Sequence, residues 1–447
     1  MNVSRYVVLG LAHVRSTWAT DVTRWSTTGS LPVEFVKCVS VDELRARVAS
    51  GRTFSAALLD ARVTAVDRDV LAELRDAGVP VIIVGSEEER DWSALGASAT
   101  VGPNLDRSQL LDALVEHGRS VDAVPDDATT PVPDQDEPVP IWRGRLVAVT
   151  GRPGSGTSTI AAALAQRAAD DPRQAGDAVL VDLCRRAHQA LLHDARDVVP
   201  GVQELVEAHR TGRPSFEQVR NLCFDVPTRR YRLLLGLRRQ RDWVSIRPRA
   251  FSAALDGLRQ STRLVVADLD DDLDGEEETG STDIEDHNLM TRTTVADADV
   301  VVVVALPTIT GMHGLVTMLD ELRRFDVPGD RTLVVINRAP RNVRSRAEIT
   351  RVLAELTSAG DLPDPHVGPV FVPERRSIES THRDLGRFAG SIADPPGRAV
   401  LEILDRLGGR DLEVDRASGL PDGPVPIRPG ELGHWGDDDL PDVGTGS

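Results

Sequence analysis

The chain has 447 residues, of which 40% are hydrophobic, and this is enough to bury the cores of two or three domains. Its longest apolar run, residues 300–306, is far shorter than the roughly 20 residues of a membrane-spanning helix, and no secretory signal pattern is visible. The three cysteines are scattered without CxxC spacing, which argues against a disulfide scaffold or a zinc ribbon and favours a reducing cytoplasm.

The formal net charge of −18 is concentrated in three segments. Residues 121–140 contribute −6, residues 268–286 contribute −11, and residues 411–447, with nine acids and two arginines, contribute −7. The rest of the chain is therefore weakly basic. Lys37 is the only lysine, so the remaining cations are arginines. An arginine in place of a motif lysine is therefore uninformative in this chain, whereas a neutral residue there is informative.

Residues 1–120 alternate short β-rich runs with helical patterns. The predicted strands are YVVLGL, EFVKCVS, SAALLDA and VPVIIVG, and the predicted helices are VDELRARVAS, DRDVLAELRDAG and residues 108–117. Such alternation predicts an α/β domain in which helices cover a parallel sheet.

Asp60 ends the third predicted strand, where a response-regulator receiver carries its phosphoacceptor. The resemblance is incomplete, because Leu11 and Ala12 stand where the receiver has its acidic pair, and Gly102-Pro103 stands where it has Lys-Pro. Without metal ligands, phosphorylation of Asp60 lacks electrostatic support. We therefore expect residues 1–120 to form a degenerate receiver-like (flavodoxin-like) domain that serves docking or dimerisation.

Residues 121–140, rich in Pro, Asp and Thr, are typical of an acidic linker. The β/α alternation restarts over residues 141–410, with helices predicted at 158–169, 317–325, 346–358 and 397–407. The predicted strands are RLVAVTG, AVLVDL, RLVVADLD, DVVVVVALP, RTLVVINR and PVFVP. Their unbroken apolar runs favour a mostly parallel sheet covered on both faces. Residues 411–447, dominated by Pro, Gly and Asp, are predicted to be a disordered acidic tail.

The segment GRPGSGTST, residues 151–159, connects a predicted strand to a predicted helix. In this context backbone N–H groups and a helix N-terminus can hold phosphate. The same glycines would also suit a tight turn without a ligand. The segment resembles the GKGGxGK[ST] loop of the MinD/ParA family of P-loop ATPases.

Four further landmarks follow in the order of that family. Asp182 in VLVDL resembles the switch I aspartate, and Asp268 in RLVVADLD resembles the Walker B aspartate. Asn337 and Arg338 in LVVINR resemble the adenine-side pair, and Pro373 in VFVPE resembles the purine-contact loop. With its degenerate front domain, the chain is most similar to the CpaE/TadZ pilus-assembly branch and to actinobacterial septum-site-determining proteins.

Three positions depart from the family pattern. The signature lysine falls on Arg152, the phosphate-binding Walker lysine falls on Thr157, and the second switch I aspartate falls on Cys184. The first exchange keeps the charge. The other two remove the cation that stabilises the transition state and the acid that positions water, so most phosphoryl-transfer catalysis should be lost. We expect a pseudo-ATPase with no catalytic residues.

Nucleotide binding can outlive hydrolysis, because the loop amides and the helix dipole remain. The resemblance implies ATP or ADP with Mg²⁺ as ligands, with the ion held by Ser158, Asp182 and Asp268. The expected nucleotide-binding residues are Gly151, Gly154, Ser155, Gly156, Thr157, Ser158, Thr159, Asn337, Arg338 and Pro373.

Two charged segments have simpler interpretations. The eight arginines of residues 229–249 are expected to form a solvated helix face rather than a nucleic-acid surface, with Trp243 in the core. The acids of residues 270–278 lack EF-hand spacing, so we expect a flexible acidic insertion rather than a calcium site.

The leading hypothesis is a cytoplasmic, homodimeric spatial regulator or assembly factor of a pilus or secretion machinery or of septum placement. A slow ATP-hydrolysing switch is the alternative. A dinucleotide-dependent reductase is disfavoured, because TGxxGxG is one residue shorter than its loop and no Tyr-xxx-Lys pair can form with Lys37 as the sole lysine. Nucleic acid is not an expected partner. The acidic tail should be repelled by anionic lipid, so we expect a protein partner to mediate any recruitment to a membrane, pole or septum.

Overall fold

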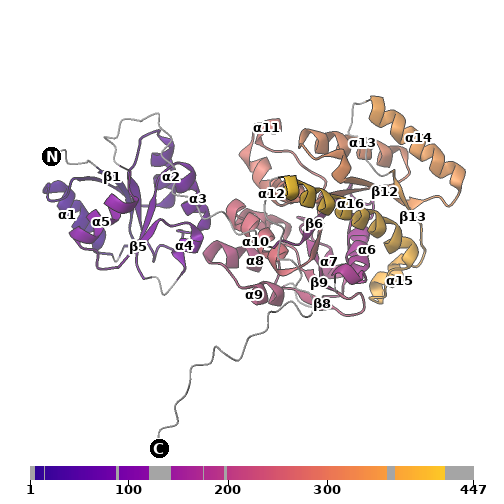
Figure 1. The fold of residues 1–447 in the computed structure, drawn as a ribbon, viewed down its shortest axis with the longest axis horizontal. Coiled ribbons are helices and arrows are strands. Elements are labelled where there is room, and N and C mark those ends of the chain that lie inside the picture. Colours follow the sequence, from indigo (N-terminus) through magenta and orange to yellow (C-terminus); the bar gives the residue numbers. More distant parts are fainter. Residues whose placement is uncertain are drawn as a thin grey trace, which may run out of the picture. The chain divides into compact units, whose positions relative to one another are not determined.

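The computed structural model describes residues 6–14, 16–86, 90–119, 142–174, 176–195, 199–359 and 368–417. The predicted linker at 121–140 and residues 418–447 of the predicted tail lie outside the described residues. The described chain forms two β-sheets, each covered by helices (Figure 1).

The first sheet has the order β2-β1-β3-β4-β5, and all of its strand pairs are parallel. This is the doubly wound order 2-1-3-4-5. Its strands are β1 (Tyr6–Leu11), β2 (Val33–Cys38), β3 (Ala56–Asp60), β4 (Val81–Val84) and β5 (Ala99–Val101). Its helices are α1 (Trp18–Thr27), α2 (Val41–Ala49), α3 (Arg68–Asp76), α4 (Trp92–Leu95) and α5 (Arg107–His117).

Both faces of this sheet are buried because successive side chains of a strand point to opposite sides. Val8 packs in one core with residues of α1 and α5, whereas Leu9 packs in a second core with residues of α2, α3 and α4. The predicted parallel α/β architecture is therefore confirmed here. Helices α1 and α4 and strand β5 were not predicted. α4 and β5 have only four and three residues, whereas the helical apolar period of α1, with Trp18, Val22 and Trp25 on one face, was missed.

The second sheet has eight strands in the order β13-β12-β11-β6-β10-β7-β9-β8. Every pair is parallel except the β8–β9 hairpin, so the prediction of a mostly parallel sheet is confirmed. Its strands are β6 (Arg145–Thr150), β7 (Ala178–Asp182), β8 (Phe224–Val226), β9 (Tyr231–Leu234), β10 (Leu264–Asp268), β11 (Val300–Ala305), β12 (Thr332–Ala339) and β13 (Val370–Pro373).

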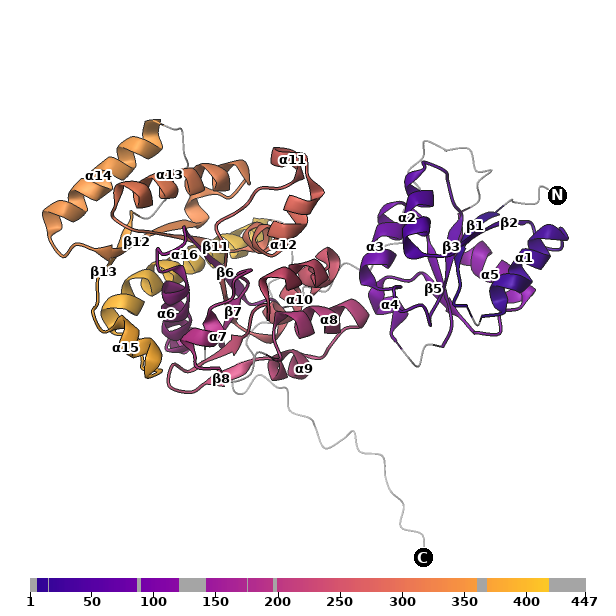
Figure 2. The same cartoon turned by 180° about the vertical axis from the view of Figure 1, so that it is seen from behind.

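Helices cover both faces of the second sheet (Figure 2). Residues of α8, α10, α12 and α13 share one core with alternate residues of β6, β7, β10 and β11, while α6 packs against β6, β7 and β10. The helices are α6 (Thr157–Ala169), α7 (Gln189–Leu192), α8 (Val202–Thr211), α9 (Phe216–Asn221), α10 (Pro248–Ser261), α11 (Glu276–Thr279), α12 (Thr282–Asp297), α13 (Ile309–Arg324), α14 (Val343–Ala359), α15 (Ile378–Arg383) and α16 (Gly390–Ala417).

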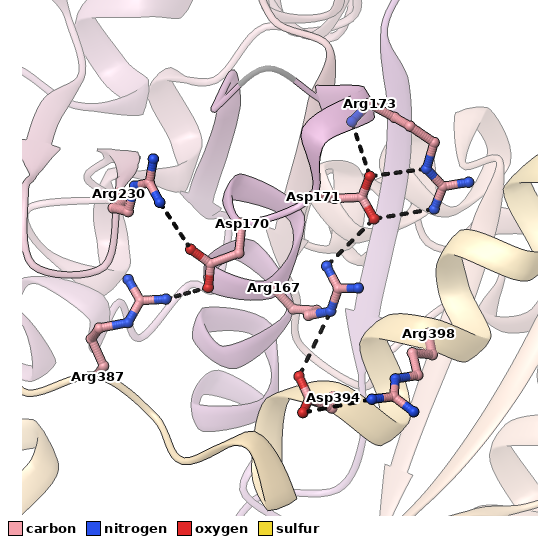
Figure 3. Close-up of polar contacts among 8 residues, drawn as sticks. All are labelled: Arg167, Asp170, Asp171, Arg173, Arg230, Arg387, Asp394 and Arg398. Carbon is pink, nitrogen blue, oxygen red and sulfur yellow. Dashed lines mark hydrogen bonds and ion pairs between the residues drawn. The ribbon is translucent and has the colours of Figure 1, made fainter.

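Ion pairs hold the carboxyl end of α6 (Figure 3). Asp171, which is 5% exposed, accepts hydrogen bonds from the backbone N–H of Arg173 at 3.0 Å and from its Nε at 2.9 Å. Arg167 of α6 lies 3.4 Å from Asp171 and 3.7 Å from Asp394 at the start of α16. These contacts fix the helix whose amino end forms the site described below.

Two expectations for charged segments are wrong. Residues 229–249 do not form one solvated helix face, because they contain β9, a short 3₁₀ helix (Gln240–Ser245) and the start of α10, and Arg229 is fully buried. Trp243 is partly buried and packs against the core, as predicted. The acidic insertion of residues 270–278 is not an open loop throughout, since its last three residues lie in α11.

Candidate functional site

The glycine-rich loop lies between the end of β6 and the start of α6. Gly154 and Gly156 have φ angles of +84° and +91°, in the left-handed region that glycine tolerates. A Cβ atom at Gly156 would also collide with the side-chain amide of Asn337. That amide donates a hydrogen bond to the carbonyl oxygen of Ser155 at 2.8 Å, so the end of β12 is tied directly to the loop.

Thr157, at the position of the family's phosphate-binding lysine, is engaged within the loop. Its hydroxyl lies 2.8 Å from the Ser155 hydroxyl and 3.5 Å from the carbonyl oxygen of Gly151. Arg152 is half exposed and forms an ion pair of 3.4 Å with Asp271, while its stem lies against Gly314 of α13. The hydroxyl of Thr157 contributes no charge to the loop.

A cavity of about 220 Å³ adjoins the loop on the side of β12 and β13. Its lining brings together several residues predicted from the sequence, namely Gly156, Thr159, Asn337, Arg338 and Pro373. The hydroxyl of Thr159 lies 3.1 Å from Nε2 of His382, which comes from α15 and also lines the cavity. A planar heterocycle next to a phosphate-binding loop would fit such a cavity.

Two acids and a thiol meet at the carboxyl ends of β7 and β10. Asp182 and Asp268 are register partners on these adjacent parallel strands, and Cys184 follows β7 by two residues. One ligand atom from each of the three residues lies within 4.8 Å of the others, and all three residues are buried. Asp182, Cys184 and Asp268 are called the acid–thiol cluster below.

Gln189 of α7 closes over this cluster. Its backbone N–H donates to Asp182 Oδ2 at 2.8 Å, and its side-chain Nε2 donates to Asp268 Oδ2 at 2.7 Å and to the carbonyl oxygen of Ser158 at 3.1 Å. Gln189 is fully buried. Gln189 therefore links the ends of β7 and β10 to the first turn of α6, and no motif in the sequence pointed to this role.

The electrostatics of the cluster are dominated by burial. Burial raises the pKa of Asp268 first, and the neighbouring Asp182 carboxylate raises it further, against hydrogen bonds from Ser158 and Gln189. Burial also raises the pKa of Asp182 and that of the Cys184 thiol. Arg185 follows the cluster in sequence, but its Nε is paired with Asp270 at 2.8 Å.

The expected Mg²⁺ ligands fit the ion only in part. Asp182 and Asp268 lie together, and Asp268 Oδ1 is buried, as a cation ligand would be, without a hydrogen bond of ordinary geometry to the described residues, the Ser158 hydroxyl being its polar neighbour. Mg²⁺ takes an octahedral shell of oxygen atoms, however, and the third donor of the cluster is sulfur. Asp182, Cys184 and Asp268 therefore suit a divalent cation that accepts sulfur as a ligand, but they do not suit an ion that requires oxygen ligands alone.

Asp60 in the first sheet is held by an unrelated set of contacts. Its side chain accepts hydrogen bonds from Trp18 Nε1 at 3.0 Å, from the Arg62 backbone N–H at 3.0 Å and from the hydroxyl of Ser16. Burial alone would raise the pKa of Asp60, but these hydrogen bonds and the Arg62 side chain outweigh burial and lower the pKa to about 2. Both carboxylate oxygens are therefore occupied.

Comparison with known proteins gives matches among solved structures only. No family model and no curated protein matches the chain. The chain is similar to the ParA family ATPase from Chlorobium tepidum TLS, with 15% identity, a TM-score of 0.44, and coverage of 58% of this chain and 98% of that chain. It is also similar to the cell division ATPase MinD from Pyrococcus furiosus, with 17% identity, a TM-score of 0.42, and coverage of 59% and 99%.

A third similar structure is the septum site-determining protein MinD from Pyrococcus horikoshii OT3, complexed with Mg-ADP. The identity is 16%, the TM-score is 0.42, and the match covers 60% of this chain and 98% of that chain. These structures come from the MinD/ParA family whose motifs the sequence resembles. In the part of the chain that the structure describes, no helix is long and apolar enough to cross a membrane.

Proposed function

We propose that this chain is a MinD/ParA-like spatial regulator or assembly factor that binds nucleotide weakly and does not hydrolyse it. One observation carries the proposal: Thr157 occupies the position of the phosphate-binding lysine, and its hydroxyl is hydrogen-bonded inside the loop to Ser155. The fold of a phosphate-binding loop is thus kept without its central charge. Phosphoryl transfer depends on positioned charge more than on covalent chemistry, so the loss falls mainly on catalysis.

The surrounding charges support the loss of hydrolysis. The arginines beside the loop and beside the acid–thiol cluster, Arg152 and Arg185, are engaged by Asp271 and Asp270 of the acidic insertion. Cys184 stands where the family carries its water-positioning aspartate, and burial raises the pKa of the thiol. A neutral thiol neither orients nor deprotonates water well.

Retained binding is supported by the parts that remain. The left-handed glycines keep the loop open at the amino end of α6, where backbone N–H groups and the helix dipole attract phosphate. Asn337, Arg338 and Pro373 line the cavity beside the loop and are proposed to contact the base. A divalent ion bound with the nucleotide would lie between Ser158 and the two aspartates.

The first sheet is proposed to act as a pseudo-receiver within a domain of residues 1–120, followed by a P-loop domain of residues 141–410. Its order 2-1-3-4-5 is that of flavodoxin-like folds, and Asp60 ends β3 with its carboxylate fully engaged. We propose that this domain docks a protein partner and that the chain works as a homodimer. The machinery served is one of pilus or secretion assembly or of septum placement, and the partner brings the chain to the pole or septum.

A slow ATP-hydrolysing switch is the second candidate. Arg152 favours it, because its side chain is half exposed and held by a single 3.4 Å ion pair, so it can exchange Asp271 for a phosphate oxygen. In this alternative Arg152 supplies the charge that Thr157 lacks.

One experiment separates the two candidates. Purified full-length protein is titrated with ATP and Mg²⁺ by calorimetry, and phosphate release is measured on the same sample, with Ser158→Ala as the matched control. The proposal expects weak, saturable binding and phosphate release equal to that of the control. Release in the wild-type protein that disappears in Ser158→Ala would establish the slow switch instead.

A further inference from the structure

The acid–thiol cluster places two carboxyl groups and a thiol inside the protein, and the nearby Arg185 does not pair with any of them in the described residues. Asp182 is fully buried and Asp268 is 1% exposed. Arg185, the cation next to Cys184 in sequence, is already paired with Asp270, which is itself an acid. Keeping carboxylates ionised in a buried site without a countercharge is unfavourable. A bound divalent cation would remove this cost.

Hydrogen bonds satisfy the cluster only in part. Asp182 Oδ1 accepts from the Cys184 backbone N–H at 3.2 Å, and its Oδ2 accepts from the Gln189 backbone N–H. Asp268 Oδ2 accepts from Gln189 Nε2. Asp268 Oδ1 is buried and makes no hydrogen bond of ordinary geometry with the described residues, although the Ser158 hydroxyl lies close enough to Asp268 to lower its pKa. A lone buried carboxylate oxygen calls for a donor or for a metal ion.

A second orphaned atom lies at the same place. Gln189 is fully buried, and its Oε1 has no hydrogen-bond partner in the described part of the chain, although the other atom of the same amide contacts Asp268. The amide is thus held against the cluster with its oxygen unused. An amide oxygen is a metal ligand, and an exchange of the amide's two ends would turn it towards an ion beside Asp268.

We propose that Asp182, Cys184 and Asp268 bind one divalent metal ion of the thiol-accepting class, such as Zn²⁺ or Co²⁺, in preference to Mg²⁺, without requiring nucleotide. Cysteine sulfur and carboxylate oxygen are ordinary Zn²⁺ ligands with bonds of about 2.0–2.3 Å, whereas Mg²⁺ requires oxygen. The three ligand atoms, within 4.8 Å of one another, can reach a single ion with small side-chain movements. On binding, the metal–sulfur bond replaces the S–H bond of Cys184, and the proton passes to solvent.

The inference concerns the same pocket as the proposed function, but it stands apart from it experimentally. Nucleotide binding is measured with ATP and Mg²⁺, whereas the metal site is measured with the metal alone. A chain that binds Co²⁺ and no ATP would refute the first proposal only. A chain that binds ATP with Mg²⁺ and shows no cobalt–sulfur bond would refute the second only.

The test uses metal-free, full-length protein and Co²⁺, because a Co²⁺–thiolate bond gives a charge-transfer band in the near ultraviolet. The chain has only three cysteines, Cys38, Cys184 and Cys223, which makes the sulfur assignable. We expect a saturable band with one Co²⁺ per chain, displaced by Zn²⁺ and unaffected by excess Mg²⁺. The double variant Cys38→Ser, Cys223→Ser, in which Cys184 is the sole cysteine, should keep the band in full.

Cys184→Ser should abolish the band, and Asp268→Asn should weaken Co²⁺ binding by about tenfold or more, in line with the loss of one metal ligand. The sole-cysteine variant keeps the proposal testable even where Cys184→Ser fails to fold. Absence of a thiolate band in the wild-type protein, its loss in the sole-cysteine variant, or its persistence in Cys184→Ser would each overturn the proposal. Displacement of Co²⁺ by Mg²⁺ at similar concentration would overturn the claimed preference.

Discussion

The guanidinium of Arg229 stacks on the ring of Phe388, with its Cζ atom 4.3 Å from the ring centroid. Arg229 is fully buried, and it donates to the carbonyl oxygens of Gly386 at 3.0 Å and Thr381 at 3.2 Å. This side chain therefore fastens the segment after α15 to the turn that leads into β9. Since that segment adjoins the cavity beside the loop, the arginine is structural rather than a surface charge.

Replacing Arg229 with Met should destabilise the protein by about 2–4 kcal/mol, because two buried carbonyl groups lose their donor. The matched control is Arg230→Met. Arg230 is mostly exposed and lies 3.7 Å from Asp170, so its replacement should cost no more than about 0.5 kcal/mol. Urea denaturation of both variants measures the difference. Equal losses would show that burial of Arg229 has little energetic weight.

Arg229 and Phe388 show which features of the fold could be predicted from the sequence and which could not. The central strands were predictable because unbroken runs of Val, Leu and Ile have few other uses, as in β11 (Val300–Ala305). The β8–β9 hairpin was not, because its arginines resemble a solvated helix. Arg229 is buried because it bonds to carbonyl groups and stacks on a ring that lie more than 150 residues further along the chain. A local sequence pattern contains no information about such distant partners.

The glycines of the loop give a second prediction. Gly154→Ala should lower the free energy of unfolding by about 1–2 kcal/mol, which is the backbone strain of a left-handed alanine. No steric cost is added, because a Cβ there meets no atom within 4 Å. Gly156→Ala should cost more, because the new Cβ displaces the Asn337 amide from Ser155. A double-mutant cycle with Asn337→Ala tests this. In the Asn337→Ala background the cost of Gly156→Ala should fall to that of Gly154→Ala, and additivity would exclude the clash.

Asp171 yields a prediction about acid stability. Hydrogen bonds from Arg173, opposed by burial, lower the pKa of Asp171 from 3.8 to about 2 (Figure 3). A carboxyl whose pKa is lower in the folded state stabilises that state at any pH above its pKa in the unfolded chain. The stabilisation disappears as the pH falls through the pKa of the folded state. Asp171→Asn should therefore cost about 1–2 kcal/mol at neutral pH, and this difference should vanish between about pH 4 and pH 2.

The control for Asp171 is Asp394→Asn. Asp394 is 43% exposed, and its arginine partners lie 3.7 and 4.0 Å away, so its replacement should leave the unfolding free energy nearly unchanged at every pH. Denaturation at several pH values distinguishes the two sites. A constant difference for Asp171→Asn down to pH 2 would show that its pKa is not lowered.

The candidate site was predictable to the extent that it follows motifs. The loop residues, the two aspartates and the residues of β12 and β13 were identified by their resemblance to the family's motifs, and the fold brings them to the carboxyl ends of neighbouring parallel strands. Gln189, His382 and the pairing of Arg152 with Asp271 were not identified. Their roles depend on how α7, α15 and the acidic insertion fold back, which spacing alone does not encode.

Asp60 should not accept phosphate from acetyl phosphate. Its oxygens are occupied by Ser16, Trp18 and Arg62, and the acidic pair that would hold a metal ion is absent at Leu11 and Ala12. Mass spectrometry after incubation with acetyl phosphate and Mg²⁺ checks this, with Asp60→Asn as control. A stoichiometric adduct that requires Mg²⁺ and disappears in Asp60→Asn would restore a working phosphoswitch.

Thr157 gives the prediction that bears most directly on function. Thr157→Lys places a cation where the family carries one and should strengthen ATP binding by about 1–3 kcal/mol, the range of a charge-assisted contact. Thr157→Met is the matched control, since it has similar length without charge and also removes the hydrogen bond to Ser155. Only the lysine variant should bind more tightly.

Hydrolysis should require a second change, because the carboxylate that orients water is missing at Cys184. We expect Thr157→Lys alone to bind ATP without turnover, whereas Thr157→Lys, Cys184→Asp should release phosphate at a measurable rate, since the added carboxylate acts on the chemical step. Calorimetry gives the affinity and phosphate release gives the rate for each variant. Tighter binding with Thr157→Met would show that relief of the internal hydrogen bond, rather than charge, limits affinity. Turnover in Thr157→Lys alone would show that the aspartate is dispensable and that the missing lysine by itself accounts for the loss of activity.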